Sequence, residues 1–410
     1  MNRGFYIILA AQFFSALADN ALLFAAIALL MGLQAPGWQT PVLQQFFVFS
    51  YIALAPFVGP FADAFPKGKV MFISNAVKFA GCLFMLLGSH PLYDYGIVGI
   101  GAAMYSPAKY GILTEYLPSH KLVLANGWME GLTVAAIIFG AIFGGILVKP
   151  ELANKYLAMF DIPGIETGID TPPEFAISMI LSLYLSAAII NLYIPRVALD
   201  HKLPRKDPLY ILYDFWHCFK LLWRDPLGQV SLAVTTLFWG VGATLRLILL
   251  AWAAMVLKFG LDKSTQLTAV VAVGIAIGSV IAAKYVKLEN SVRILPVGIV
   301  MGLCLMLMIT VSNLYIAIIL LLVIGAFTGF FIVPMNALLQ HRGHLLMGAG
   351  HSIAVQNFNE NLSILAMLGI YAVMIRLEFS VFTVIVSFGI LISVVMAYLY
   401  RRHGQDRIEA

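Results

Sequence analysis

Long apolar stretches recur along the whole chain and constrain its fold more than any other feature. Breaks rich in Pro, Gly and charged residues separate stretches of about 20 residues, which is the length an α-helix needs to cross a hydrocarbon core of roughly 30 Å. Of the 410 residues, 61% are hydrophobic and 11% are charged, whereas about 25% of the residues in a soluble domain are charged. The sequence therefore predicts an all-α polytopic membrane protein.

Twelve of these stretches are predicted to span the membrane. Their approximate limits are 5–32, 41–62, 70–88, 95–117, 122–147, 175–195, 230–256, 265–286, 292–311, 314–338, 349–374 and 379–400. An even number of spans places both termini on one side. The longest connection on that side, 196–229, separates six spans from six. We therefore expect two six-helix bundles, 1–195 and 230–410, the second of which ends in a short tail.

The predicted linker contains one amphipathic pattern. Its apolar residues fall at helical spacing, opposite Asp214 and Lys220, and they are Leu209, Leu212, Trp216, Phe219 and Trp223. Such a pattern is typical of a helix that lies in the membrane interface. We interpret this helix as a tether between the two bundles.

Positive charge is distributed unevenly between the two sets of loops. The loops opposite the termini contain few of the 25 Lys and Arg residues: Lys149, Lys155, Lys258, Lys263 and Arg376. Because cytoplasmic loops carry the excess of Lys and Arg, both termini are predicted to be cytoplasmic. The same rule accounts for the net charge of +5, so the charge does not indicate a nucleic-acid partner.

Six ionisable residues are predicted to lie well inside spans. They are Asp19, Lys78, Lys109, Glu130, Arg246 and Glu360. An unpaired charge at the bilayer centre costs about 2.5 to 3.5 kcal/mol, so these residues must pair with one another or line a hydrated path. Interhelical salt bridges are the structural alternative, and a substrate path is the interpretation that we favour. Arg246 suits a phosphate or a carboxylate, because its guanidinium is a planar fork of donors.

No motif of intramembrane catalysis occurs in the chain. The patterns HExxH, GxxxxGK[ST] and GxSxG are absent, and Cys82, Cys218 and Cys304 have no spacing that indicates a metal site or a disulfide framework. No His falls near the middle of a predicted span, which disfavours a His-based proton relay. We therefore predict that the protein is not an enzyme and uses no cofactor or metal.

The turn after the second predicted span carries a loop motif. Gly59 is followed four positions later by Asp63 and then by the basic residues Lys67 and Lys69. In a chain with twelve predicted spans and a central linker, this turn resembles the loop signature of the major facilitator superfamily. The resemblance implies the two-bundle fold of that superfamily. It also implies that Asp63, Lys67 and Lys69 latch the cytoplasmic ends of the two halves in the outward-facing state.

Four further segments are similar to one branch of that superfamily, the bacterial lysophospholipid transporters of the LplT family. These segments are Ala11–Phe24, Tyr105–Leu113, Ala125–Gly131 and Ala354–Asn361. The resemblance implies a flippase of the bacterial inner membrane that carries lysophosphatidylethanolamine, lysophosphatidylglycerol and related lysolipids from the outer to the inner leaflet. It also implies that neither ATP nor an ion gradient is obligatory. The acyltransferase that re-acylates the product is expected to be a separate cytoplasmic partner.

The residues inside the predicted spans suit such a substrate. The phosphate of a lysolipid needs a cation, an ethanolamine head needs a carboxylate, and the acyl chain needs an apolar wall or open lipid. The residues that we predict to bind substrate are Asp19, Asn20, Lys78, Lys109, Glu130, Arg246, Gln356, Asn357 and Glu360. We expect alternating access by rocking of the two halves, with substrate arriving sideways from the membrane lipids.

Two other functions remain compatible with the same sequence. In a proton-coupled facilitator for a small solute or drug, a carboxylate such as Asp19 or Glu360 would exchange a proton in each cycle. In a membrane scaffold or sensor that transports nothing, the six charges would be structural only. Transport that survives collapse of the proton gradient would count against the first function, and a separable loss of activity in an Arg246 variant would count against the second.

Overall fold

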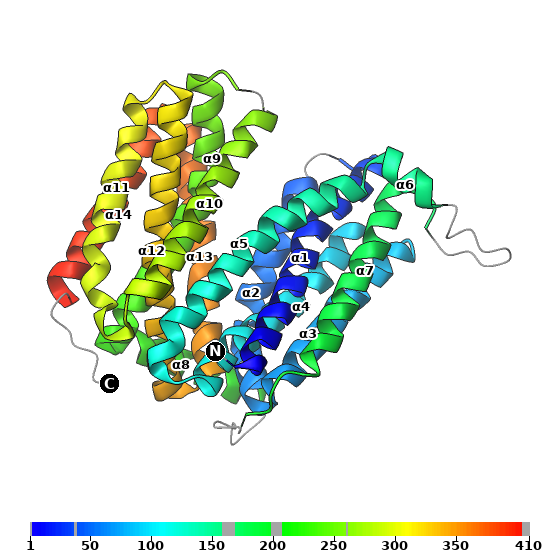
Figure 1. Ribbon diagram of the computed structural model, residues 1–410, viewed down its shortest axis with the longest axis horizontal. Helices are drawn as coiled ribbons and strands as arrows, with labels where there is room; N and C mark the ends of the chain where they lie inside the picture. Colours follow the sequence, from blue (N-terminus) through cyan, green and yellow to red (C-terminus); the bar gives the residue numbers. More distant parts are fainter. Residues whose placement is uncertain (1, 37–38, 158–168, 198–206, 260, 404–410) are drawn as a thin grey trace. The chain divides into compact units, whose positions relative to one another are not determined.

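The computed structural model describes residues 2–36, 39–157, 169–197, 207–259 and 261–403, and these fold mainly into helices (Figure 1). The α-helices are α1 (Arg3–Gly32), α2 (Gln39–Ala64), α3 (Lys67–Leu86), α4 (Pro91–Tyr116), α5 (Leu122–Leu147), α6 (Pro150–Leu157), α7 (Pro172–Asn191), α8 (Pro208–Arg224), α9 (Pro226–Val256), α10 (Leu261–Tyr285), α11 (Leu295–Leu307), α12 (Leu314–Met347), α13 (Ala349–Arg376) and α14 (Val381–His403). Short 3₁₀ helices lie between some of them: η1 (Ser119–Lys121), η2 (Leu288–Asn290), η3 (Val292–Ile294) and η4 (Met308–Thr310). The predicted all-α fold class is confirmed. Residues 198–206 of the predicted linker 196–229 and residues 404–410 of the predicted tail lie outside the described residues.

Eleven helices in the described part of the chain are long and apolar enough to cross a membrane, and they coincide with eleven of the twelve predicted spans. The remaining predicted span, 95–117, corresponds to α4, a helix of 26 residues. Its middle contains Lys109 and several Gly, Tyr, Ser and Pro residues, so it is less apolar than the other eleven. The chain is a multi-pass membrane protein, and the crossing by α4 stays a prediction.

The helical structure follows from the hydrocarbon environment of a membrane-spanning chain. In hydrocarbon, every backbone N–H and C=O must find its partner within the protein, and an α-helix satisfies them along its own length. Side chains cap the helix ends, where N–H groups are left over. Asn2 accepts from Phe5 N at 3.2 Å at the start of α1, and Asp225 accepts from Gly228 N at 2.8 Å at the start of α9.

The described residues form two compact units. Unit 1 comprises residues 1–115, 135–213 and 349–354, and unit 2 comprises residues 116–134, 214–348 and 355–410. Consequently α5, α8 and α13 each contribute residues to both units, and the last residue of α4 belongs to unit 2. The predicted division into bundles at 1–195 and 230–410 stays a prediction.

Small residues allow the helices of unit 1 to approach closely. Helix α1 packs along α7, and α3 packs along α7 as well. Ala18, Ala21 and Ala25 of α1 are fully buried, as is Tyr184 of α7. A Cβ at Gly144 of α5 would lie 2.6 Å from the backbone oxygen of Ala21, so only glycine fits there. These contacts hold α1 in the middle of unit 1, with its polar residues at fixed positions.

Glycines organise unit 2 in the same way. Helices α10 and α12 form its closest helix pair. Gly274 and Gly278 on α10 meet Gly325 and Gly329 on α12, where a Cβ at any of the four would collide with the opposite backbone. Helices α11 and α14 form a second close pair. The glycines therefore have a packing role, and the space left for ligands lies elsewhere in this unit.

The amphipathic segment of the predicted linker forms helix α8. Phe215, Cys218 and Leu222 form its buried side. In unit 2, Phe358 of α13 lies edge-on to Phe215, with ring centroids 5.5 Å apart. The apolar residues Leu209, Leu212 and Trp216 are exposed on α8, as expected for a helix that rests in the membrane interface.

Candidate functional site: buried charges in two units

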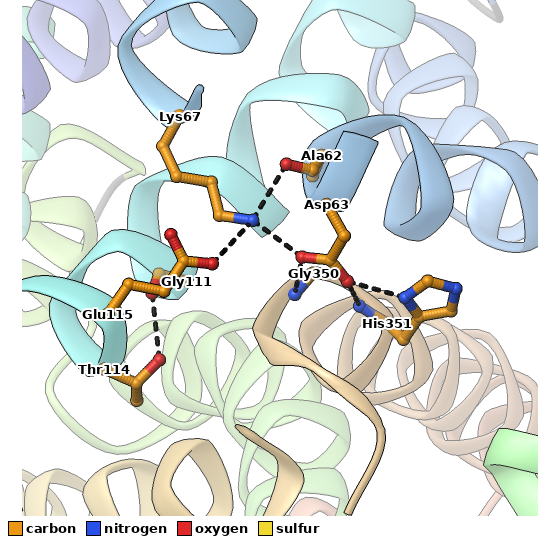
Figure 2. Close-up of polar contacts among 8 residues, drawn as sticks. All are labelled: Ala62, Asp63, Lys67, Gly111, Thr114, Glu115, Gly350 and His351. Atoms are coloured by element: carbon orange, nitrogen blue, oxygen red, sulfur yellow. Dashed lines mark hydrogen bonds and ion pairs between the residues drawn. The ribbon is translucent and has the colours of Figure 1, made fainter. Parts of the chain in front are cut away.

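The best-connected ionic cluster in unit 1 surrounds Asp63 (Figure 2). Lys67 Nζ lies 2.6 Å from Asp63 Oδ1 and 3.0 Å from Glu115 Oε1, and it also donates to the backbone oxygen of Ala62 at 2.8 Å. All three ammonium donors therefore have acceptors. The side chains of Asp63 and Lys67 are only 3% and 2% exposed, so the pair is shielded from water and from screening by salt.

The other contacts of Asp63 are with the start of α13. Gly350 N donates to Oδ1 at 2.8 Å, and His351 N donates to Oδ2 at 3.0 Å. His351 Nδ1 also lies 2.6 Å from Oδ2. These backbone N–H groups belong to the first turn of a helix, where they lack intrahelical partners and carry the positive end of the helix dipole. The carboxylate of α2 thus caps the N-terminus of α13, as Figure 2 shows.

Glycines make this close approach possible. A Cβ at Gly350 would lie 2.6 Å from Asp63 Oδ1, and a Cβ at Gly59 would lie 3.0 Å from the Cα of His351. Gly348, with φ of 98°, turns the chain from α12 into α13. The loop motif identified in the sequence therefore has a geometric basis, because its glycine makes room for α13 and its aspartate caps that helix. Lys69 does not join the cluster: it is exposed and lies over the Phe65 ring, 5.5 Å from the centroid.

A second ion pair in unit 1 joins two of the predicted substrate residues. Lys78 Nζ lies 2.7 Å from Asp19 Oδ2 and donates to Ser15 Oγ at 3.1 Å. Tyr184 OH donates to the other carboxylate oxygen at 2.7 Å. Lys78 also lies over the Tyr105 ring, 4.8 Å from its centroid. The lysine side chain is 1% exposed and the aspartate 23%, so the aspartate is the member of the pair that remains accessible.

Replacing Lys78 by methionine is expected to lower the stability of the folded protein. The change leaves the Asp19 carboxylate with one fewer charged partner in an apolar setting, and breaking a buried pair in this way costs about 3 to 5 kcal/mol, or somewhat less here because Asp19 is partly exposed. The measurement is the melting temperature of purified protein in detergent, followed by size-exclusion chromatography. Lys155→Met, at an exposed position of α6, is the matched control.

The double variant Asp19→Asn with Lys78→Met tests the cause of that loss. If the unpaired charge is responsible, the double variant should melt at a higher temperature than Lys78→Met alone. A double variant that melts at the same temperature as the single variant would show that the ion pair is not what stabilises this site.

Unit 2 contains an uninterrupted chain of polar side chains across three helices. Asn336 Nδ2 of α12 donates to Glu130 Oε1 of α5 at 3.3 Å. Gln356 Nε2 of α13 donates to Asn336 Oδ1 at 3.0 Å and to Glu360 Oε1 at 2.7 Å. All four side chains belong to residues that are at most 7% exposed. Two of the predicted carboxylates are therefore linked through amides, and the intermediate residue Asn336 was not predicted.

A reciprocal amide pair lies one helical turn from this chain. Asn126 Nδ2 donates to Gln340 Oε1, and Gln340 Nε2 donates back to Asn126 Oδ1, both at 2.8 Å. Asn126 lies near the start of α5, and Gln340 lies toward the end of α12. Both residues are buried. The pair joins a helix of the predicted N-terminal bundle to one of the predicted C-terminal bundle.

The remaining predicted polar residues occupy separate places. Lys109 of α4 lies over the Tyr110 ring, 4.1 Å from its centroid. Asn20 Nδ2 donates to the backbone oxygen of Ala16 on its own helix at 2.8 Å. Asn357 is 8% exposed on α13, next to the polar chain of unit 2. The structure therefore gathers Asp19 with Lys78, and Glu130 with Gln356 and Glu360, but it gives Lys109 and Asn20 neighbours of other kinds.

Arg246 has a different environment from the other five charges. Its side chain is exposed and forms no ion pair with any residue that the structure describes. It lies on the wall of a cavity of about 220 Å³ inside unit 2. The other residues of that wall are mainly aliphatic, among them Leu245, Leu249 and Ile324. A guanidinium beside an apolar hollow suits an amphipathic anion.

The described residues contain no group of three or more His, Cys, Asp or Glu side chains that could hold a metal ion. Several members of the polar clusters were not among the predicted site residues. Glu115 and His351 complete the Asp63 cluster, and Asn336 and Gln340 complete the chain in unit 2. Their only signal in the sequence was a polar residue close to the end of an apolar stretch.

Comparison with known proteins identifies a family that matches this chain. The sequence profile of the Major Facilitator Superfamily matches residues 8–365. The chain is 43% identical over 377 residues to the lysophospholipid transporter LplT of Serratia proteamaculans (strain 568), and the match covers 92% of this chain and 89% of that protein. It is 42% identical over 378 residues to LplT of Yersinia enterocolitica serotype O:8 / biotype 1B (strain NCTC 13174 / 8081), covering 92% and 88%.

Solved structures of low sequence identity share the fold. The E. coli fucose:proton symporter FucP has a TM-score of 0.75 with 11% identity, covering 98% of each chain. A bacterial homologue of the iron transporter ferroportin has a TM-score of 0.72 with 15% identity, covering 99% of this chain and 100% of that one. At these identities the similarity concerns the fold alone.

Proposed function

The chain belongs to the major facilitator superfamily, whose members are transporters and not enzymes, and we propose that it moves lysophospholipids across a bacterial inner membrane. The substrates of this proposal are lysophosphatidylethanolamine, lysophosphatidylglycerol and related lysolipids. They move from the outer to the inner leaflet, where a separate acyltransferase re-acylates them. Both termini of the chain lie in the cytoplasm in this proposal.

The observation that carries the proposal is the position of Arg246. A lysophospholipid has one phosphate and one acyl chain, and Arg246 places a donor fork beside an apolar cavity in the same unit. In the described residues, no carboxylate competes for that guanidinium. The phosphate is the substrate group that matches it best, because charge-assisted hydrogen bonds to phosphate are strong and bidentate.

The carboxylates serve the other end of the head group in this proposal. Glu130 and Glu360 accept from the amides of Asn336 and Gln356, and amides can turn to serve a different partner. An ethanolamine ammonium would replace these amide donors at the carboxylates. A phosphatidylglycerol-type head, which has hydroxyls and no cation, would instead hydrogen-bond to the amides themselves.

The Asp63 cluster acts as a conformational latch in this proposal. Its contacts join the adjacent ends of α2, α3 and α4 to the beginning of α13. The amide pair of Asn126 and Gln340 likewise joins α5 to α12. Alternating access requires such contacts to break when the cytoplasmic end opens and to form again when it closes. Lys69 contributes positive charge to the cytoplasmic loop rather than a direct contact with Asp63.

A proton-coupled facilitator for a small solute is the alternative. It is favoured by the two carboxylates of unit 2, which lie within one hydrogen-bonded chain and could titrate together. A proton-coupled facilitator, however, gives no role to Arg246 beside an apolar cavity. The two functions differ in their dependence on the proton gradient.

The experiment is the movement of labelled lysophosphatidylethanolamine to the inner leaflet of cells with and without the protein. We expect protein-dependent movement that is unchanged after an uncoupler collapses the proton gradient. Movement that stops when the proton gradient is collapsed would contradict this proposal and support the proton-coupled alternative. A labelled diacyl phosphatidylethanolamine is the control substrate, and it should not move.

A further inference from the structure

The cavity of unit 2 continues well beyond Arg246. Its walls come from α9, α10, α11, α12 and α14, together with η4. A second hollow of about 40 Å³ adjoins it. The two share lining residues on three helices: Gly242, Leu245, Leu305, Ile324 and Thr328. Together they form a larger, mainly apolar space inside unit 2.

One face of α9 supplies a guanidinium and an indole N–H to this space, while Thr268 of α10 and Thr328 of α12 add hydroxyls. Gly242, Leu245, Arg246, Leu249 and Trp252 all line it, and their spacing of three or four residues places them on one side of the helix. Arg246 is exposed on this face. The two nitrogen donors of this face are thus set into a mainly apolar wall.

Trp252 supplies a second, independent observation. It is fully buried, and its indole N–H has no acceptor among the described residues. A buried donor without an acceptor is uncommon in proteins, and it leaves this N–H open to a partner from outside the chain. Since Trp252 lines the cavity, a ligand in the cavity can provide that acceptor. Hydrocarbon alone cannot, because it has no lone pair.

Building on the proposed function, we infer that this cavity binds the single acyl chain of the lysophospholipid, with the phosphate at Arg246 and the ester carbonyl at the Trp252 N–H. The occupant follows from the chemistry of the wall. The aliphatic side chains of α10, α11 and α12 favour a hydrocarbon chain, and the two donors of α9 favour one anion and one neutral acceptor. A lysolipid offers these three groups in one molecule.

Gly242 provides a direct way to fill the cavity. A Cβ at Gly242 meets nothing within 4 Å, so a larger side chain can be added without a backbone collision. Gly369 of α13 is the matched control, because it is also an exposed helical glycine with nothing within 4 Å of its Cβ position, and it does not line the cavity. The variants are Gly242→Phe and Gly369→Phe.

The measurement is the initial rate at which proteoliposomes of the full chain move palmitoyl and octanoyl lysophosphatidylethanolamine, each at a low substrate concentration. Gly242→Phe should lower the rate for the palmitoyl substrate by at least about tenfold, as expected if two or more methylene groups lose their apolar site. It should change the rate for the octanoyl substrate much less. Gly369→Phe should leave both rates close to those of the unmodified protein.

The outcomes separate this inference from the function on which it rests. If the unmodified protein moves neither lysolipid, the proposed function fails. If it moves both and Gly242→Phe behaves like Gly369→Phe with the palmitoyl substrate, the function stands and the inferred chain site is refuted. An equal loss for both chain lengths would also refute it, because that pattern does not depend on the length of the acyl chain.

A second variant tests the same site if Gly242→Phe does not fold. Trp252→Phe keeps an aromatic ring but removes the N–H. The unmodified protein should move an ester-linked lysolipid several-fold faster than the ether-linked analogue, which lacks the carbonyl. Trp252→Phe should move the two at equal rates. A preference for the ester that persists in Trp252→Phe would contradict the assigned hydrogen bond.

Discussion

Arg246→Ala is expected to lose most of the lysophospholipid movement of the unmodified protein while it accumulates in the membrane at a near-normal level. The alanine variant loses the donors that we assign to the substrate phosphate. Hydrogen bonds to charged groups contribute about 1.5 to 3 kcal/mol, so the rate at low substrate should fall by roughly 10- to 160-fold. The stability of the folded protein should change little, because Arg246 is exposed and makes no ion pair with the described residues.

Two further variants make this result specific. Arg246→Lys should recover only part of the rate, because an ammonium keeps the charge but not the planar fork. Arg376→Ala, an exposed arginine at the end of α13, should have the rate of the unmodified protein. Both are measured as the initial rate per folded molecule, with abundance quantified by size-exclusion chromatography. Full activity of Arg246→Ala would refute the proposed phosphate site.

Asp63→Ala is expected to shift the protein toward states in which the start of α13 is accessible. The alanine variant loses the ion pair with Lys67 and the cap on Gly350 N and His351 N. A charge at a helix N-terminus is worth about 0.3 to 2 kcal/mol, and a hydrogen bond to a charged group is worth about 1.5 to 3 kcal/mol. The population of the open form should therefore rise roughly tenfold or more. The substrate residues of unit 2 are unchanged by this substitution.

A cysteine reporter measures that shift. Ser352 follows His351 on α13 and is fully buried, so Ser352→Cys in a background without the native cysteines should react slowly with a membrane-permeant maleimide. Asp63→Ala should increase the labelling rate of this cysteine. Lys69→Ala is the matched control, since Lys69 belongs to the same motif but is exposed and does not contact Asp63. Equal labelling rates in the presence and absence of Asp63 would contradict the latch.

The helices were predictable because a bilayer leaves few structural choices. Apolar stretches of spanning length predict the transmembrane helices, and eleven of them qualify in the described structure. The family was predictable from the Gly59 to Lys69 turn and the four similar segments, and the comparisons confirm it. Helix α12 is longer than the predicted span 314–338, since it continues to Met347. Gln340, Arg342 and His344 interrupt the hydropathy but not the helix.

The partners of the charged residues were less predictable. The sequence indicated that Asp19, Lys78, Glu130 and Glu360 need polar neighbours but not which ones. Lys78 finds Asp19 through the packing of α1 and α3 against α7. Glu130 reaches Glu360 only through amides on α12 and α13. Such pairings depend on which helix faces are brought together, and no local pattern in one span encodes the face of another.

The Asp63 cluster illustrates the same limit. Its glycine, aspartate and lysine are adjacent in sequence and were found there, whereas Glu115 and His351 come from segments far along the chain. The geometry also separates the two lysines of the motif, since Lys67 is buried against Asp63 and Lys69 is exposed. Spacing alone could not distinguish them, because both follow the same turn.

A leaflet assay shows whether this chain moves lysophospholipids. Purified protein is reconstituted into vesicles, palmitoyl lysophosphatidylethanolamine with a radiolabel is added to the outer leaflet, and the fraction that albumin can extract is followed over time. We expect the extractable fraction to fall faster with the unmodified protein than in protein-free vesicles, and to fall at close to the protein-free rate with Arg246→Ala. Equal rates for the unmodified protein and protein-free vesicles would contradict the account.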